Sequence, residues 1–328
     1  MCWTGVPRAC CPPPAKGANV PRSLGLISAV LIIALGLAHS ATAGPSVADV
    51  VSRVNRECYA NFLAGLPNEC WANRAMHSPQ HDVTGEIIFN ELKRLGLHPY
   101  RERFIYSDPN GGISTACNII AVKHGVTRQD EIYVAGAHYD SKSNPGADDN
   151  ASGVAALLEM ARVLQGHKLG ATLVFAFFDG EEVTDTNGVH RLGSSRYAAQ
   201  HATDNIKGMI SVDMIAWRQP GWRGGTAGIE GRSSMTKITL ALIDAISAYG
   251  DGLRVRKRHG AGDYGDHVAF ANAGFQAVML IEWGWYGNPN YHKAGDAVEK
   301  PGYIDLDYAV RMTKSALGYF VTAAQIAR

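Results

Sequence analysis

Hydrophobic and polar positions alternate in blocks along the chain, and the blocks predict an α/β fold. Four largely apolar runs have the length of buried strands: 132–137, 171–178, 209–212 and 277–281. Between the first two runs, apolar residues recur every three or four positions from Ser152 to Leu164, as in a helix packed on a sheet. Strand, helix and strand in this order favour a parallel crossover unit. We therefore expect a three-layer, doubly wound, mostly parallel mixed sheet with helices on both faces.

The segment before these runs has patterns typical of covering helices and edge strands. Apolar residues have helical spacing from Val47 to Leu66 and from Val83 to Leu95, with Asp82 as the expected N-cap and Gly96 as the stop of the second helix. Two short segments, 100–105 and 118–122, have the pattern of strands at the edge of the sheet. We assign no chemistry to this region and expect its histidines, His77, His81 and His98, at the surface.

The first 43 residues have the pattern of an export signal. An unbroken run of apolar and small residues extends from Leu24 to Ala38, preceded by basic residues without acids, and Ala41-Thr42-Ala43 fits a cleavage site. A run of roughly 15 residues is short for a membrane span, which needs about 20. We expect a signal peptide over 1–43, a secreted or periplasmic protein, and no stable membrane association after cleavage; the alternative is a retained anchor.

Composition places the remaining chain, 44–328, in one domain with a sizeable core. The full chain is 46% hydrophobic, and no Pro/Ser/Gly-rich linker divides it. Its 31 basic and 30 acidic residues give no electrostatic case for binding nucleic acid. Three cysteines follow the expected signal peptide, and in an exported protein Cys58 and Cys70 could close a short loop. The alternative is that these two and Cys117 are buried thiols.

Side chains of the metal-binding type stand where the apolar runs end. His138 and Asp140 end the first run two residues apart, so they point to the same side of an extended chain. A metal-bound imidazole usually donates its other N–H to a carboxylate, so Asp140 is expected to hold the ring of His138. Taken alone, this segment fits equally a histidine that ends a strand and acids that cap the next helix.

Acids and histidines recur at the ends of the other three runs. Because sites in open α/β sheets lie outside the carboxyl ends of the strands, these side chains are expected to converge. Two imidazoles and three carboxylates suit a borderline divalent cation, zinc first. One zinc ion takes fewer ligands than this, whereas two metal ions that share one carboxylate would use them all. The five candidate ligands are His138, Asp149, Glu182, Asp213 and His292.

Six segments resemble, in order, those of the secreted zinc aminopeptidases with a co-catalytic metal pair, which are related to glutaminyl cyclases and glutamate carboxypeptidase. The segments are AHYDS, PGADDNASG, FFDGEE, SVDMI, GDHVAF and YHKAGD, and the resemblance extends from Asn118 to the C-terminus. In the family the bridging aspartate directly precedes the Asn-Ala-Ser-Gly type of sequence, which selects Asp149 over Asp148. The resemblance implies two Zn²⁺ per chain, one held by His138 and Asp213, the other by Glu182 and His292, with Asp149 bridging.

The resemblance also implies roles for residues around the ligands. Glu181 matches the general base of the family, and Tyr291 matches a tyrosine that steadies the oxyanion. Asp266 matches an aspartate that lies behind the metal ligands. From their location after the last apolar run, Trp283 and Trp285 are expected to form an apolar wall for the first side chain of the substrate or else to plug the edge of the sheet.

These features predict a metal-dependent exopeptidase. The resemblance implies that a hydroxide bridging two zinc ions attacks the N-terminal bond of a peptide or small protein with a free N-terminus, while Glu181 acts as base. The spacing alone allows any dinuclear hydrolase, and a binding protein without catalysis is disfavoured because every ligand is present. The segment after Glu182, VTDTNGVHRLGSS, is longer than the common family form and resembles glutaminyl cyclases. A single-zinc glutaminyl-peptide cyclotransferase is therefore the alternative, although cyclases typically carry Trp where Tyr291 stands.

Overall fold

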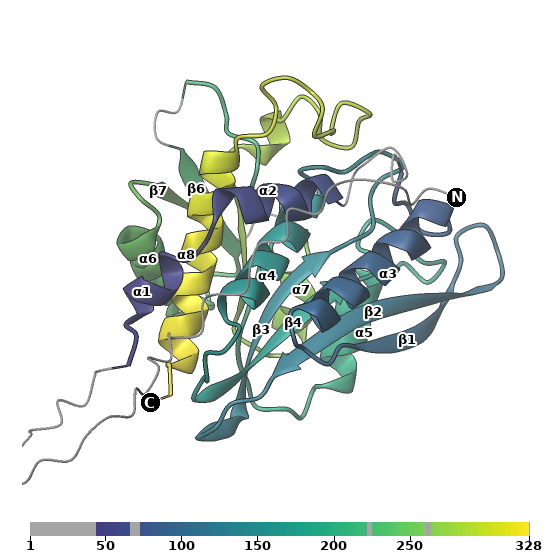
Figure 1. The fold of residues 1–328 in the computed structure, drawn as a ribbon. Coiled ribbons are helices and arrows are strands. Elements are labelled where there is room, and N and C mark those ends of the chain that lie inside the picture. Colours follow the sequence, from purple (N-terminus) through teal and green to yellow (C-terminus); the bar gives the residue numbers. More distant parts are fainter. Residues whose placement is uncertain (1–43, 66–72, 222–224, 260–263, 328) are drawn as a thin grey trace, which may run out of the picture.

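The computed structural model describes residues 44–65, 73–221, 225–259 and 264–327 (Figure 1). The N-terminal part contributes α1 (Val47–Val51), α2 (Arg56–Gly65), α3 (Pro79–Arg94), β1 (Tyr100–Ser107), β2 (Ile113–Lys123) and β3 (Arg128–His138). The middle contributes α4 (Ala151–Val163), β4 (Ala171–Phe178), α5 (Leu192–Gln200), β5 (Ile206–Val212), β6 (Thr226–Gly231) and α6 (Thr236–Tyr249). The chain continues through β7 (Arg254–His259), α7 (His267–Asn272), β8 (Ala277–Glu282), a 3₁₀ turn (Trp285–Gly287) and α8 (Leu306–Ala324).

The strands form one mixed sheet in the order β1-β2-β4-β3-β5-β8-β6-β7. The central pairs β4–β3, β3–β5 and β5–β8 are parallel, as is β6–β7 at one edge. The other pairs are antiparallel. The doubly wound, mostly parallel mixed sheet predicted from the apolar runs is confirmed, and β1 lies at an edge as expected.

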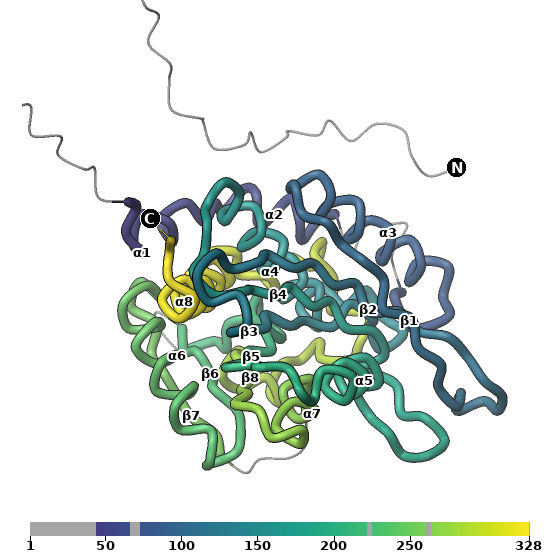
Figure 2. Tube along the Cα trace, turned by 90° about the horizontal axis from the view of Figure 1, so that it is seen from below, coloured from purple at the N-terminus to yellow at the C-terminus, as the bar shows by residue number. Residues whose placement is uncertain are grey.

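Both faces of the central strands are buried, which explains why these strands are apolar without interruption. In β4, Leu173, Phe175 and Phe177 face a large core that also contains side chains of α4, α6 and α8. The intervening Val174, Ala176 and Phe178 face a smaller core with α5 and α7. Figure 2 shows α4 and α8 on one side of the sheet and α5 and α7 on the other. The three-layer architecture follows from this alternation.

The N-terminal helices differ in detail from the prediction. The helix expected over 47–66 is two helices, and Asn55 begins the second because its Oδ1 accepts the Cys58 N–H at 2.9 Å. The next helix begins at Pro79 rather than after Asp82. Ser78 caps it, accepting the His81 N–H at 3.2 Å, and proline suits the first helical position.

Several predictions concern residues at or beyond the limits of the described chain. The expected signal peptide, 1–43, lies outside the described residues. Cys58 is disulfide-bonded and Cys117 is a free thiol, but Cys70, the expected partner of Cys58, falls within the undescribed segment 66–72. Within the described ranges, none of the helices has the length and apolar character needed to span a bilayer.

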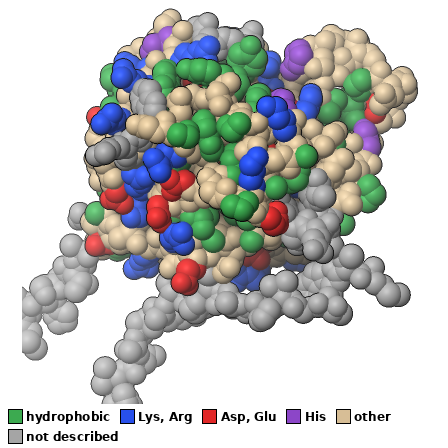
Figure 3. Space-filling view, turned by 90° about the horizontal axis from the view of Figure 1, so that it is seen from above, with side chains coloured by type: hydrophobic (Ala, Val, Ile, Leu, Met, Phe, Trp, Pro, Cys, Tyr) green, Lys and Arg blue, Asp and Glu red, His purple; other side chains and the backbone are tan. Residues whose placement is uncertain are grey.

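The surface mixes the two signs of charge. Figure 3 shows Lys and Arg side chains interspersed with Asp and Glu over the face it presents, with hydrophobic side chains between them. This distribution agrees with the nearly equal numbers of basic and acidic residues in the sequence. The concentrated negative charge of the molecule lies instead among buried residues at the ends of the central strands.

Candidate metal centre and active site

The site lies at the carboxyl ends of four strands that run in the same direction. His138 is the last residue of β3, Asp213 directly follows β5, and the loop after β8 carries His292. Gly180, with φ of 69°, turns the chain after β4 into Glu181 and Glu182. Because neighbouring parallel strands end at one edge of a sheet, residues far apart in sequence meet there.

The five candidate ligands form two groups that share one carboxylate. His138, Asp149 and Asp213 make the first group, and Asp149, Glu182 and His292 make the second. Asp149 Oδ1 lies 3.3 Å from His138 Nε2, whereas its Oδ2 lies 3.2 Å from His292 Nε2. His138 Nε2 is 3.5 Å from Asp213 Oδ1, and His292 Nε2 is 3.1 Å from Glu182 Oε1.

The donors fit a pair of divalent cations. Glu182 Oε1 and Asp213 Oδ1 are buried without a hydrogen-bond partner in the described part of the chain. Burial and the charge of Asp149 raise the pKa of Glu182 to about 7. Three carboxylates crowded against two imidazoles carry negative charge that burial disfavours, and bound cations would relieve it. Nitrogen and oxygen donors in this ratio suit zinc.

Asp149 and its neighbour Asp148 face different surroundings. Asp148 Oδ1 accepts the Ala216 N–H at 2.8 Å, and its Oδ2 accepts from Asn288 Nδ2 at 3.1 Å. Its carboxylate therefore accepts hydrogen bonds from the loops behind the ligands and belongs to neither ligand group. Asn150, which follows Asp149, caps α4 by accepting the Gly153 N–H at 2.9 Å. Asp149 is thus held directly before the N-cap of a buried helix.

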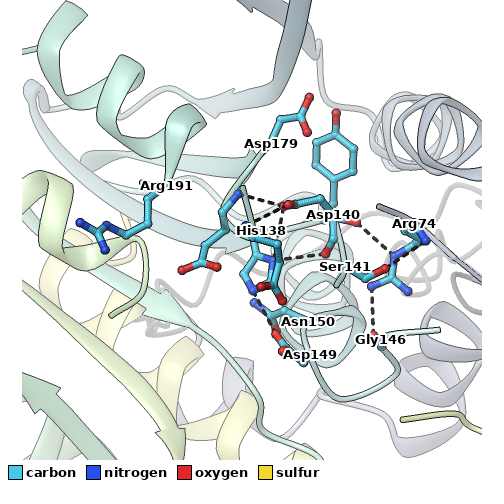
Figure 4. Close-up of polar contacts among 12 residues, drawn as sticks. Arg74, His138, Asp140, Ser141, Gly146, Asp149, Asn150, Asp179 and Arg191 are labelled. Atoms are coloured by element: carbon cyan, nitrogen blue, oxygen red, sulfur yellow. Dashed lines mark hydrogen bonds and ion pairs between the residues drawn. The ribbon is translucent and has the colours of Figure 1, made fainter. Parts of the chain in front are cut away.

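Asp140 lies behind His138 and supports two ligand segments at once. Its Oδ1 is 3.5 Å from His138 Nδ1, on the opposite side of the ring from Asp149, as Figure 4 shows. The same carboxylate accepts the N–H groups of Glu181 at 3.1 Å and Glu182 at 3.0 Å. His138 Nδ1 also lies 3.3 Å from the Asp140 backbone carbonyl. Asp140 therefore orients a candidate ligand on β3 through its carbonyl and carboxylate, and its carboxylate holds the two glutamates after β4.

Glu181 is placed beside the metal groups and differs from Glu182 in its surroundings. Burial raises the pKa of Glu181 well above its ordinary value, and the charges of Glu182, Asp266 and Asp213 raise it further against the opposing effect of His138. Such a carboxylate accepts a proton more readily than a solvated glutamate does. Asp266 is buried at the start of α7, where burial raises its pKa to about 6.

Aromatic side chains line one side of His292. The Tyr291 ring stacks on the His292 imidazole with centroids 3.8 Å apart, and Trp285 meets Tyr291 edge-on at 5.4 Å. Burial raises the pKa of Tyr291 above its ordinary value, and the nearby carboxylates add to this effect, so the phenol keeps its proton. Trp285 and Tyr291 pack against Met214, Met279 and Ile281.

Trp283 stands apart from this aromatic group. The residue is half-buried, and its backbone N–H donates to the Thr226 carbonyl of β6 at 3.2 Å. Among the ring contacts of the described residues, none joins Trp283 to Tyr291 or Trp285. Of the two tryptophans expected at the substrate pocket, only Trp285 is brought beside the candidate catalytic tyrosine.

A family model described as Peptidase family M28 matches residues 118–319, which is more than half of the chain. The chain belongs to peptidase family M28. This finding confirms the family resemblance of the six sequence segments. The matched range begins in β2 and ends in α8, so it contains all the candidate ligands together with Glu181 and Tyr291.

Relatives of this M28 chain match over part of their length. An uncharacterized protein of Escherichia coli, YfbL, is 30% identical over 215 residues, covering 52% of this chain and 62% of that protein. A probable leucine aminopeptidase of Trichophyton verrucosum is 29% identical over 220 residues, covering 62% and 56%. A probable zinc metalloprotease of Pyrenophora teres is 38% identical over 108 residues, covering 30% and 22%. The chain thus spans less than two thirds of each of these relatives.

Solved structures share the M28 fold at low sequence identity. The leucine aminopeptidase precursor of Bacteroides thetaiotaomicron superposes with a TM-score of 0.69 at 20% identity, covering 82% of this chain and 97% of that one. The glutaminyl cyclase of Porphyromonas gingivalis gives a TM-score of 0.69 at 22% identity, covering 82% and 99%. The fold is therefore similar to that of proteins named for either activity.

The expectation that His81 lies at the surface is wrong. His81 is 6% exposed, and its Nε2 lies 2.7 Å from Asp179 Oδ1 at the end of β4. Its ring stacks on Tyr139 at 5.0 Å. Burial alone lowers the pKa of His81, but the charge and hydrogen bond of Asp179 outweigh burial and raise it to about 9. His77 and His98 are exposed as expected.

Arg74 is a buried residue that supports the candidate site and was not predicted from the sequence. It donates to the carbonyls of Tyr139 at 3.1 Å and Gly146 at 2.9 Å, and to that of Pro145 (Figure 4). These carbonyls belong to the loop between His138 and Asp149. A buried arginine before the matched range has no motif of its own, so its sequence carries no signal for this role.

Proposed function

We propose that this protein is a zinc metallo-aminopeptidase that hydrolyses the N-terminal bond of peptides or small proteins. The observation that carries the proposal is the position of the Asp149 carboxylate. Its two oxygens face separate groups of ligand-type side chains. A carboxylate shared in this way is the arrangement that a two-metal site needs. The match to peptidase family M28 supports peptide chemistry.

The metal pair would be held by the two groups described above. His138 and Asp213 would hold one ion, Glu182 and His292 would hold the other, and Asp149 would contribute to both. When bound, such a pair activates water and polarises a carbonyl oxygen. Asp140 orients His138 through Nδ1, which leaves Nε2 directed at the metal position.

Glu181 acts as the general base and later as the acid. It takes a proton from the attacking water and delivers it to the leaving amine, because hydrolysis of a peptide bond transfers a proton from water to the leaving nitrogen. Its raised pKa and its backbone hydrogen bond to Asp140 support this role. Glu182, one residue further on, carries the ligand function because its Oε1 lies 3.1 Å from His292 Nε2.

Tyr291 donates a hydrogen bond to the developing oxyanion. The stack on His292 and the edge contact from Trp285 hold the phenol ring next to the metal groups. Trp285, which packs on the buried Met214 and Met279, forms the apolar wall that receives the first side chain of the substrate. A free α-amino group bound among the carboxylates restricts cleavage to the N-terminal bond.

A glutaminyl-peptide cyclotransferase with one zinc ion is the second candidate. It is favoured by the long segment after Glu182 and by the fold shared with the cyclase of Porphyromonas gingivalis. In the structure this segment folds back on itself, with Asp185 accepting the N–H groups of Asn187 and Val189 at 2.8 Å each. The shared carboxylate of Asp149 favours the aminopeptidase.

Release of a chromogenic amine from leucine, alanine and lysine derivatives, measured beside cyclisation of a glutaminyl peptide, tests the proposal. We expect amine release that a chelator abolishes and that zinc restores. Cyclisation of the glutaminyl peptide without release from any of the three derivatives would establish the cyclase instead. Loss of activity in Glu181→Gln, prepared in parallel, assigns the signal to this site.

We further propose that the protein is exported, because the first 43 residues have the pattern of a cleavable signal. Sequencing the N-terminus of protein recovered outside the cytoplasm tests this, with Gly44 as the expected first residue. A product in the exported fraction that retains the apolar run would contradict cleavage after Ala43.

A further inference from the structure

We propose that Asp296 is a positioning residue that ties the loop carrying His292 to the shared ligand Asp149. The inference rests on the proposed two-metal function and goes beyond it, because Asp296 belongs to neither ligand group. Its side chain is fully buried. The residue lies four positions after His292 and is hydrogen-bonded to the loop that precedes α4.

Asp296 receives three consecutive backbone N–H groups of that loop. Its Oδ1 accepts the Asp148 N–H at 2.7 Å, and its Oδ2 accepts the Asp149 N–H at 3.2 Å. Its own carbonyl accepts the Ala147 N–H at 3.1 Å. One oxygen of a buried carboxylate thus binds the backbone of the shared ligand and the other binds the residue before it, and a carboxylate is a strong acceptor of hydrogen bonds.

The turn after His292 is also held by hydrogen bonds at its first residue, Lys293. The Asp296 N–H donates to the Lys293 carbonyl at 2.9 Å, which closes the turn over 293–296. Asn144 donates from Nδ2 to the same carbonyl at 3.2 Å. Asp296 and Asn144 therefore join the segment between His138 and Asp149 to the segment that begins with His292.

This arrangement affects the two metal positions unequally. The second group, with Glu182 and His292, takes two of its three side chains from the segments that Asp296 joins. The first group, with His138 and Asp213, takes only Asp149 from them. Loosening Asp296 is therefore expected to weaken the second position more than the first.

Asp296→Asn is the most informative substitution because it keeps the shape of the side chain. The carboxylate accepts two N–H groups, whereas an amide presents one oxygen and one NH₂ group. One backbone N–H then faces a donor instead of an acceptor. Substitution of residues that support metal ligands typically costs 10- to 100-fold in metal affinity, and we expect a loss of about this size at the second position.

The test is zinc titration of the metal-free full chain in competition with a fluorescent chelator, with Co²⁺ absorption as a report on each position. Asp108→Asn is the matched control, because Asp108 is also a buried carboxylate that accepts a backbone N–H, from Asn110 at 2.8 Å, in the β1–β2 turn. We expect wild type and this control to bind two zinc ions with the same affinities. In Asp296→Asn the second ion is expected to bind about 10- to 100-fold more weakly, and the first within a few fold of wild type.

Two wild-type affinities in Asp296→Asn would overturn the inference and leave the proposed function intact, and so would equal weakening at both positions. A wild-type chain that binds a single zinc ion would overturn the proposed function and the inference together. If Asp296→Asn does not fold, Asn144→Ala takes its place, with a smaller loss expected at the second position. Unchanged affinities in that variant would also overturn the inference.

Discussion

At the scale of single residues, the surroundings of Asp149 keep its carboxylate ionised. Burial by itself raises the pKa of Asp149, but hydrogen bonds and charges from His138 and His292 outweigh burial and hold it below its ordinary value. The carboxylate therefore stays charged in the absence of metal, with an imidazole at each oxygen. A ligand that is ionised beforehand has no proton to lose when a cation binds.

Replacing Glu181 separates catalysis from metal binding. Glu181→Gln keeps the size of the side chain and the N–H bond to Asp140 but removes the ability to accept a proton. We expect kcat to fall about 100- to 10,000-fold, the range that general base catalysis contributes. Zinc content and thermal stability, measured on the same preparation, are expected to stay at the wild-type values. A kcat within a few fold of wild type would show that another group takes the proton.

The His81–Asp179 pair predicts a pH-dependent contribution to stability. Because the folded-state pKa of His81 is raised from 6.5 to about 9, the pair stabilises fully below pH 6.5 and loses its effect as pH rises through about 9. The shift corresponds to on the order of 3 kcal/mol. We expect the free energy of unfolding of zinc-free Asp179→Asn to lie furthest below wild type at pH 6 and to approach it by pH 10.

Denaturant unfolding at several pH values measures this difference. Asp82→Asn is the control, since Asp82 is also near His81, at 3.5 Å, but its side chain is 91% exposed and contributes little. A gap between wild type and Asp179→Asn that stays constant from pH 6 to pH 10 would show that His81 does not titrate as the structure implies.

Residues that act through distant partners were the hardest to predict. His81 looked like a surface residue because its partner Asp179 lies 98 positions away, and no local pattern connects them. Asp296 stands within the recognised segment YHKAGD, yet the N–H groups it accepts belong to residues almost 150 positions earlier. Local spacing shows which side chains end a strand, whereas the pairing of loops depends on the assembled fold.

At the scale of elements, the start of α4 is fitted closely against the end of β5. A Cβ at Gly153 would collide with the Val212 carbonyl and with the Asn150 side chain. Asn150 Nδ2 also donates to the Val212 carbonyl at 2.9 Å, so the helix start and the strand end are joined at this point. This contact brings Asp149, before the helix, next to Asp213, after the strand.

Gly153→Ala tests this close approach. The added methyl group must push α4 away from β5, and overpacking of this kind costs about 1–3 kcal/mol in the free energy of unfolding. Gly65→Ala is the matched control, because a Cβ at Gly65 in α2 meets nothing within 4 Å. Thermal or denaturant unfolding is expected to show the loss in Gly153→Ala alone. Equal stability of the two variants would contradict the proposed packing.

Elements with strong periodicity were predicted well, and their boundaries less so. The apolar run 171–178 coincides with β4 because a strand buried on both faces admits few polar residues. The helix expected from Val83 begins at Pro79 because Ser78 and Pro79 form a better start than Asp82. The break between α1 and α2 contains neither glycine nor proline, so the apolar spacing continued through it.

At the scale of the whole molecule, the shared direction of the central strands explains where the site lies. Strands β4, β3, β5 and β8 run parallel to one another in the centre of the sheet, so the segments after them emerge at the same edge. The sequence predicted this convergence because acids and histidines follow every one of these strands. The pockets and contacts that select a substrate depend on loop conformations, for which the sequence has no comparable regularity.

Zinc content per chain is the measurement that tests the central claim most directly. The full chain is stripped with chelator, reconstituted with zinc, freed of excess metal and analysed by mass spectrometry of the metal against protein concentration. We predict two zinc ions per wild-type chain and at most one in Asp149→Ala, which removes the carboxylate that both groups share. One ion per wild-type chain, with an unchanged value in Asp149→Ala, would contradict the account.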